Sequence, residues 1–188
     1  MNLCYRFEEY NYTDGFLNSV DTTYIIHLEN NGRYDAIQDQ LNKFHPTNRV
    51  YILYNKGFKK CKKNIHEQKS TIDLVDAYFT IFQHSVDNKY KNILVLEDDF
   101  MFDDKIKVVY DSINNFIIKK DGRVFSYLLG CLPLLQTLSS DNHSILLLSA
   151  GTHAVIYSFK MVEYVLTKDK DTISDWDIFM NFTAGKNS

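Results

Sequence analysis

Over the first half of this chain, short apolar runs alternate with segments in which apolar residues recur at helical spacing. The runs TYIIHL from Thr23, VYILY from Val50 and NILVL from Asn92 are rich in β-branched and aromatic residues and predict strands. Between them, apolar residues recur at helical spacing over residues 33–45 and 70–85. This alternation predicts the α/β class, with a Rossmann-like, mainly parallel sheet that is flanked by helices.

The second half of the chain continues the pattern. Helices are predicted at residues 105–120, 159–166 and 175–182, and strands at VFSYLLG, SILLLS and HAVIYS. The 188 residues, 45% of them hydrophobic, are enough for one globular core, so the whole chain, residues 1–188, is interpreted as a single domain. Residues 1–21 mix aromatic and charged side chains without a clean period and stay unassigned.

The charge pattern gives little reason to expect a nucleic-acid ligand. The formal net charge is -3, and the sequence has no long stripe of Lys and Arg. The one basic cluster, KGFKKCKK at residues 56–63, is interpreted as a solvated loop or helix start, with a phosphate or anionic-surface contact as the alternative. Just beyond it, Ser70 and Asp73 have the spacing of a capping box and predict a helix start.

The cysteines and the hydropathy pattern favour a cytoplasmic protein. Cys4, Cys61 and Cys131 are odd in number and lack metal-type spacing, so we expect reduced thiols and no zinc site. The N-terminus lacks the apolar core of an export signal, and the longest apolar stretch, residues 124–138, is too short to span a bilayer. We therefore expect no transmembrane segment and a cytoplasmic location.

Three neighbouring carboxylates, Glu97, Asp98 and Asp99, directly follow the predicted strand NILVL. Open α/β sheets bind ligands beyond the carboxyl ends of their strands, and three adjacent negative charges repel one another unless a cation neutralises them. Mg²⁺ and Mn²⁺ favour carboxylate oxygens, and side-chain alternation sends Glu97 and Asp99 to one side and Asp98 to the other. These residues predict a divalent metal site, with helix capping or pairing with surface lysines as the alternative.

The order of these segments resembles a known enzyme family. TYIIHLENNGR, VYILY and ILVLEDDF, followed by YLLG, GTHAVIYS and a late DWD, look like the nucleotide-sugar glycosyltransferases of the A-type fold over roughly residues 22–182. They are most similar to the lipopolysaccharide-type glycosyltransferase family, which includes members in large DNA viruses. For a viral protein the expected cytoplasmic location is the cytoplasm of the host. The resemblance implies the A-type fold and transfer of a sugar from a nucleoside diphosphate sugar, a UDP-sugar above all, to a glycan or another hydroxyl acceptor.

The resemblance also implies roles for individual residues. Glu97 and Asp99 match the outer carboxylates of a D-x-D variant, which bind Mn²⁺ or Mg²⁺ and through it the diphosphate. Asp98 matches the middle carboxylate, which faces the ribose or the sugar. The residues that the resemblance further implies near the nucleotide are His27, Leu28, Arg33, Tyr54 and Asn55. His153, in GTHAVIYS, could reach the metal or a phosphate and is a further candidate for nucleotide or sugar binding. Arg33 has a plain helix-surface position as an alternative, and His153 a structural role as a hydrogen-bonded histidine.

An inverting enzyme also needs a carboxylate base that takes the proton of the acceptor hydroxyl. Asp175 and Asp177 of the late DWD are the candidates, because this motif resembles the acceptor side of the family. Ser174 and Asp177 also have capping-box spacing, and if Asp177 caps the helix, Asp175 becomes the better base. Trp176 could stack on a sugar face, but we expect it in the core. The chain ends soon after DWD, where larger family members continue, and is interpreted as a compact enzyme or as one domain of a longer protein.

Three other functions fit the acidic motif in part. ILVLEDD resembles the opening strand of a receiver domain, but no phosphoacceptor Asp follows the strand predicted at VFSYLLG. A metal-dependent phosphohydrolase could use a carboxylate as its nucleophile, but it would need a basic residue and hydroxyl donors, and nothing of that kind follows EDDF. A catalytically silent nucleotide-sugar-binding domain fits the same residues as the enzyme.

Overall fold

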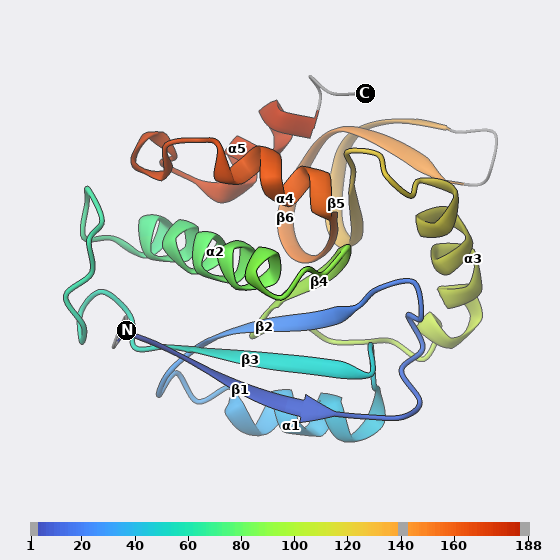
Figure 1. Cartoon of the computed structure of the whole chain (residues 1–188), viewed down its shortest axis with the longest axis horizontal. Helices are drawn as coiled ribbons and strands as arrows, with labels where there is room; N and C mark the ends of the chain where they lie inside the picture. Colours follow the sequence, from blue (N-terminus) through green and yellow to red (C-terminus); the bar gives the residue numbers. More distant parts are fainter. Residues whose placement is uncertain (1–3, 139–142, 185–188) are drawn as a thin grey trace.

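The computed structural model describes residues 4–138 and 143–184, and these contain one mixed six-stranded sheet with helices packed against both faces (Figure 1). The strands are β1 (Tyr5–Asn11), β2 (Thr22–Leu28), β3 (Arg49–Asn55), β4 (Asn92–Glu97), β5 (Ser126–Leu138) and β6 (Ser144–Ser158). The helices are α1 (Tyr34–Lys43), α2 (Ser70–Asp87), α3 (Ile106–Lys119), α4 (Phe159–Leu166) and α5 (Trp176–Ala184), with a short 3₁₀-helix, η1 (Lys170–Thr172). The strand order across the sheet is β1-β3-β2-β4-β6-β5.

The prediction of a Rossmann-like, mainly parallel sheet of the A-type glycosyltransferase class is wrong, because most strand pairs are antiparallel. Only β3–β2 and β2–β4 are parallel, whereas β1–β3, β4–β6 and β6–β5 are antiparallel. Two segments account for the difference. The unassigned N-terminal segment forms β1 and pairs with β3 at one edge of the sheet, and β6 returns from β5 in a long hairpin and lies against β4 in the opposite direction.

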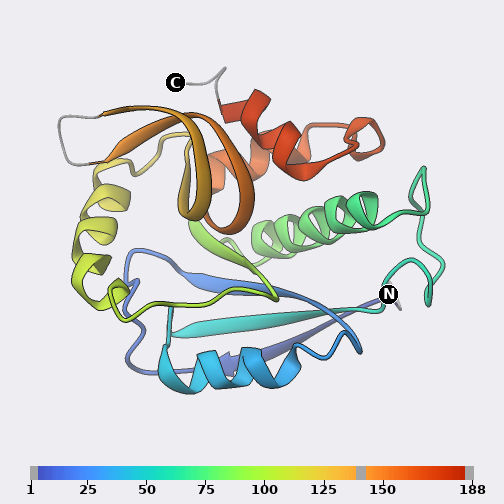
Figure 2. The ribbon, with the colours of Figure 1, turned by 180° about the vertical axis from the view of Figure 1, so that it is seen from behind.

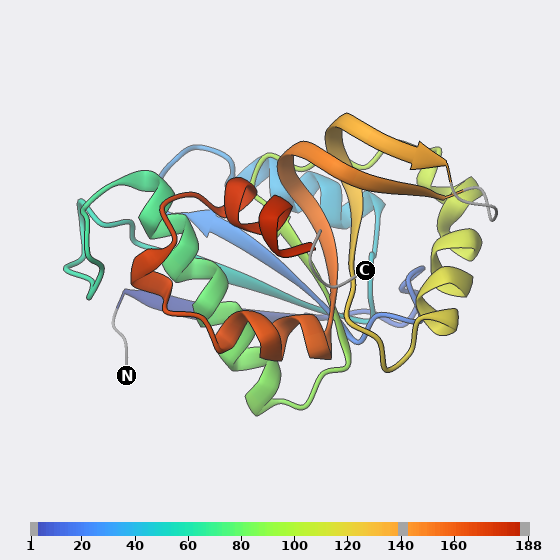
Figure 3. The ribbon, with the colours of Figure 1, turned by 90° about the horizontal axis from the view of Figure 1, so that it is seen from above.

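Residues 144–158 form one strand, β6, rather than the two strands predicted at SILLLS and HAVIYS. Gly151 lies between those two runs and has a φ of +75°. Glycine adopts this conformation without steric cost, so the strand continues through this irregular backbone position. β5 pairs along β6 from Ser144 to Tyr157, whereas β4 pairs only with the segment from Ala154 to Ser158, so the outer part of β6 has β5 as its one partner strand among the described residues. Figure 3 shows this outer part of the hairpin curving away from β2 and β3.

The sheet separates two apolar cores, which explains why its central strands are hydrophobic on both faces. Tyr24 and Ile26 of β2 belong to the core formed with α2, α4 and α5, whereas Ile25 belongs to the core formed with α1 and α3. Figures 1 and 2 show α2 and α4 on one side of the strands and α1 on the other. Trp176 of α5 is buried, as expected, and stacks on Tyr78 of α2 with ring centroids 4.0 Å apart.

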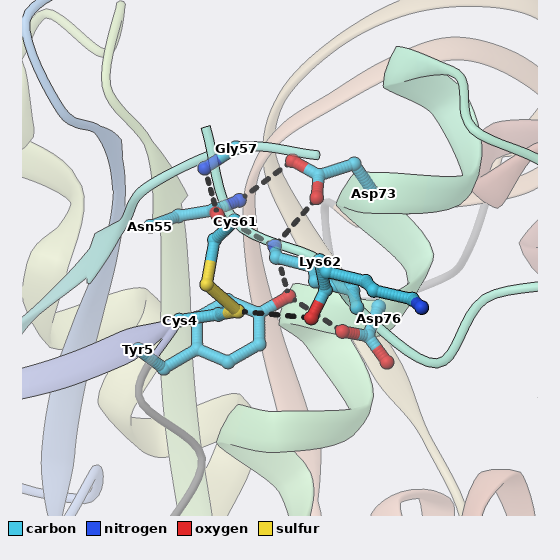
Figure 4. Close-up of a disulfide and its surroundings, with 9 residues drawn as sticks. Cys4, Tyr5, Asn55, Gly57, Cys61, Lys62, Asp73 and Asp76 are labelled. Atoms are coloured by element: carbon cyan, nitrogen blue, oxygen red, sulfur yellow. Dashed lines mark hydrogen bonds and ion pairs between the residues drawn. A yellow bond between two sulfur atoms is a disulfide. The ribbon is translucent and has the colours of Figure 1, made fainter. Parts of the chain in front are cut away.

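The expectation of three reduced thiols is wrong, because Cys4 and Cys61 form a disulfide (Figure 4). The bond joins the residue before β1 to the loop between β3 and α2. Cys131 of β5 is a free thiol. Because disulfides persist in oxidising surroundings, this pairing removes the main argument for a cytoplasmic location. Among the described residues, no helix is long and apolar enough to cross a membrane.

Lys63 lies in the basic cluster that was predicted to be a solvated loop, yet its side chain is 0% exposed. Its ammonium group donates hydrogen bonds to the side chains of Asp73, Asn55 and Tyr5. Figure 4 shows Asn55 and Asp73 pointing toward one another beside the disulfide, and the Asn55 amide donates to Asp73 at 2.9 Å. The predicted capping box at the start of α2 is therefore not formed: the Asp73 carboxylate is used by this buried network, and α2 begins without a side-chain cap.

Candidate metal site

The acidic motif lies where the ends of β2 and β4 meet the interior of β6. Because β2 and β4 are parallel, Ile26 pairs with Glu97 and the ends of both strands lie at the same edge of the sheet. Antiparallel β6 brings Ala154 opposite Leu96, so the segment around His153 reaches the same edge. Parallel strands in open sheets bind ligands beyond this end.

Glu97, Asp99 and His153 converge at this edge. Each residue offers one ligand atom, and these atoms all lie within 4.8 Å of one another. Nδ1 of His153 is 3.8 Å from Oε2 of Glu97 and 3.6 Å from Oδ1 of Asp99, so this histidine lies beside the acidic pair and not in the core. Two carboxylates and an imidazole suit a divalent ion such as Mn²⁺, and the donor set therefore fits the metal that the sequence predicted.

Glu97 lies in surroundings that disfavour its negative charge. Burial raises the pKa of Glu97, and the charges of Asp99 and Asp177 act in the same direction, whereas His153 and the hydroxyl of Tyr78 oppose them. The Tyr78 hydroxyl donates to Oε1 of Glu97 at 3.4 Å, which is a long hydrogen bond. A bound cation would stabilise the ionised carboxylate, so the electrostatics of Glu97 agree with a cation site.

Asp98 points to the other side of β4, as side-chain alternation predicts, and holds the loop between β2 and α1. Its carboxylate accepts hydrogen bonds from the backbone N–H of Leu28 at 3.0 Å, from the side-chain amide of Asn31 and from the guanidinium of Arg33 at 2.6 Å. Burial alone would raise the pKa of Asp98, but His27, Arg33 and the other donors lower it to about 2. Asp98 thus positions this loop, and its implied contact with ribose or sugar stays a prediction.

Arg33 bridges two of the three carboxylates. Its Nη1 lies 2.6 Å from Oδ1 of Asp98 and 3.4 Å from Oδ2 of Asp99. About half of the side chain is exposed, so the guanidinium is accessible to an anionic ligand. Arg33 therefore belongs to the candidate site and not to a remote helix surface.

The remaining residues that the resemblance implied near the nucleotide divide into two groups. Leu28 is exposed at the edge of the site, and the buried His27 packs against Tyr54 with ring centroids 5.5 Å apart. Nδ1 of His27 is buried and lies 3.5 Å from Oδ2 of Asp98, so its polar contact with this carboxylate is longer than an ordinary hydrogen bond. Asn55 does not join this group, because its amide binds the network around Lys63.

Asp175 and Asp177 have different environments. Oδ1 of Asp175 accepts the backbone N–H of Ile178 at 3.0 Å, which is the hydrogen bond of an N-cap residue at the start of α5. Oδ2 of Asp177 accepts the N–H of Gly151 in β6 at 2.9 Å, and the Asp177 charge acts on Glu97. The capping-box spacing of Ser174 and Asp177 had left open whether Asp177 caps this helix. Since Asp175 caps the helix, Asp177 is the candidate for the base.

Tyr78 and Gly151 of the site were not predicted from the sequence, and Asn31 was implied only as part of the segment HLENNGR. Asn31 lies in ENNG, and a polar turn directly after a predicted strand could have pointed to it. Tyr78 shares the apolar periodicity of α2, so no local signal separates it from an ordinary core residue. Gly151 contributes through its backbone N–H, which the residue type does not reveal.

At this edge the fold joins the carboxylates of Glu97 and Asp99, a histidine, an arginine and the carboxylate of Asp177 from four separate parts of the sequence. Their convergence identifies the candidate site. No protein-family model matches this chain, and no curated protein is significantly similar to it in sequence.

Proposed function

We propose that the protein is a metal-dependent glycosyltransferase that moves a sugar from a nucleoside diphosphate sugar, a UDP-sugar in the first instance, to an acceptor hydroxyl. One observation carries this proposal: Glu97 and Asp99, the outer carboxylates of a D-x-D-like motif, converge with His153 at the end of β4. The proposal does not require a mainly parallel sheet, because the antiparallel strand β6 brings His153 to the same edge.

Glu97, Asp99 and His153 would hold the metal through two carboxylates and an imidazole. When bound, the metal supplies a Lewis acid that stabilises negative charge on the diphosphate leaving group. Arg33, which is half-exposed and 3.4 Å from Asp99, offers a guanidinium for a phosphate oxygen at the same edge. Asp98 keeps Arg33 and the loop after β2 in place for this contact.

Asp177 takes the role of general base. As the bond between the anomeric carbon and the diphosphate oxygen breaks, its electron pair leaves with the diphosphate. The acceptor oxygen bonds to the anomeric carbon and gives its proton to the Asp177 carboxylate. The N–H of Gly151 orients one oxygen of this carboxylate at 2.9 Å, whereas Asp175 is less suited because it caps α5.

Isothermal titration calorimetry with UDP tests the metal site. We expect UDP to bind only with Mn²⁺ or Mg²⁺, because the sequence has no Gly-rich phosphate loop and a net charge of -3. Asp99→Asn should abolish this metal-dependent binding, since it removes one of the two carboxylate ligands. GDP and ATP, titrated in the same way, test the preference for the uracil base.

Asp104→Asn is the matched control for this experiment. Asp104 is exposed and pairs with Lys107, so the substitution should leave UDP binding unchanged. Without metal, Asp99→Asn should melt at the same temperature as the wild type or higher, because repulsion with Glu97 and Asp98 is relieved. UDP binding of equal strength without metal, or a much lower melting temperature of Asp99→Asn, would show that the acidic motif has a different role.

A further inference from the structure

A cavity of about 450 Å³ opens directly beside Asp99 and His153. It lies between the residues that follow β4, the start of α3 and the inner part of the β5–β6 hairpin, and its volume is in the range of small-molecule sites. Its walls are mostly apolar. The large apolar residues that line it include Phe100, Phe102, Ile106, Val109 and Leu129.

The lining offers few partners for a polar ligand. Besides Asp99 and His153, the charged residues among those that line the cavity are Asp103 and Lys105, and the Asp103 carboxylate already accepts the backbone N–H of Lys105 at 2.8 Å. The hydroxyl groups of a bare sugar would lose their hydrogen bonds to water against apolar walls. The cavity therefore fits an apolar group better than a bare sugar. A polar head attached to that group would fit at the end near Asp99 and His153.

Small residues leave the cavity open, and exposed apolar side chains line it. Gly130 of β5 lies opposite Ala154 of β6, and a Cβ at position 130 would meet nothing closer than the Cβ of Ala154, at 3.8 Å. A larger side chain at position 130 would therefore enter the cavity. Met101 and Val109 line the cavity although they are 84% and 45% exposed. Apolar side chains that stay exposed around a cavity indicate a surface that a ligand covers.

We propose that this cavity binds the apolar group of the sugar acceptor, and that the acceptor hydroxyl extends past Asp99 and His153 toward Asp177, which Gly151 holds on the side of His153. The acceptor is accordingly an amphipathic alcohol, with a hydroxyl-bearing head such as a sugar and an aliphatic or aromatic group attached to it. The assignment to the acceptor rests on the proposed glycosyltransferase function. The apolar cavity itself can be tested without any transfer reaction.

Alkyl β-D-glucosides, titrated by calorimetry below their micelle-forming concentrations, test the cavity. From methyl through butyl to octyl glucoside, each buried methylene should raise the affinity about threefold to fourfold until the cavity is full. Gly130→Leu should remove most of this gain by filling the cavity, and Val109→Asp should do so by placing a charge in its wall. Val108→Asp is the matched control, because Val108 is 82% exposed and is not among the residues that line the cavity.

Equal affinities for methyl and octyl glucoside would overturn the proposal, and so would wild-type binding of octyl glucoside by both cavity variants. UDP binding with Mn²⁺ is a separate readout, which Gly130→Leu should retain. If octyl glucoside binds and UDP does not, the apolar ligand class stands, while the glycosyltransferase function and with it the acceptor assignment fail. If a UDP-sugar with Mn²⁺ displaces octyl glucoside, the cavity holds part of the donor and the acceptor assignment is wrong.

Discussion

Asp177→Asn should lower the rate of sugar transfer by ~10²- to 10⁴-fold and leave UDP binding with Mn²⁺ close to that of the wild type. The Asp177 carboxylate is oriented by the N–H of Gly151 and acts electrostatically on Glu97, so it lies at the candidate metal site without belonging to the proposed ligands. An amide can keep the hydrogen bond with Gly151 but cannot take up the acceptor proton. UDP release from a panel of UDP-sugars, with octyl β-D-glucoside as acceptor, measures the rate.

Asp175 supplies the matched controls, because it lies two positions away and caps α5. Asp175→Asn should keep both activity and stability, since Asn is as good an N-cap residue as Asp. Asp175→Ala should lower the free energy of unfolding by about 1 kcal/mol with little effect on transfer. Near-normal transfer by Asp177→Asn would exclude this residue as the base and would favour a retaining mechanism or a base outside this chain. An equal loss of transfer activity in Asp175→Asn would show that Asp177 is not the base with Asp175 acting only as the helix cap.

Lys63→Met should lower the free energy of unfolding by about 3–5 kcal/mol, because it leaves the buried Asp73 carboxylate without its cation. The two side chains are 0% and 7% exposed, and Asn55 and Tyr5 complete the hydrogen bonds of the ammonium group. Burial lowers the pKa of Lys63, whereas the hydrogen bond and the charge of Asp73 oppose this effect. Domains of this kind have total stabilities of about 5–15 kcal/mol, so the loss should be plain in urea unfolding curves at neutral pH.

Two further variants separate charge from packing in this network. Adding Asp73→Asn to Lys63→Met removes the uncompensated buried charge and should restore part of the stability. Lys62→Met changes the neighbouring, exposed lysine and should alter the stability by less than about 0.5 kcal/mol. If Lys63→Met costs under about 1 kcal/mol, as for a surface ion pair, the network is not buried in solution.

Much of the secondary structure could be predicted from local patterns. The apolar runs at Thr23, Val50 and Asn92 become β2, β3 and β4, and the helical periods that separate them become α1 and α2. These patterns are readable because strand and helix periods depend on residues close to one another in the sequence. For the same reason the sequence predicted that the acidic motif follows the end of a buried strand, with Asp98 on the side opposite to Glu97 and Asp99.

Local patterns did not predict which strands, cysteines and side chains pair with one another. Nothing in the local pattern of β6 shows that it runs antiparallel to β4, because a strand presents the same alternation in either direction. Cys4 and Cys61 are 57 residues apart, and no local pattern shows that they form a disulfide. Lys63 looks like any lysine of a solvated cluster until Asp73, Asn55 and Tyr5 surround it.

The sequence by itself therefore determined the central strands, the five α-helices and the position of three carboxylates at a strand end. Only the tertiary structure decided that His153 joins Glu97 and Asp99, and that Asp175 rather than Asp177 caps α5. Both aspartates have cap-compatible spacing, and a cap is worth only about 1 kcal/mol, so local preference cannot choose between them. The choice follows from β6, which reaches the end of β4 and offers the N–H of Gly151 to Asp177.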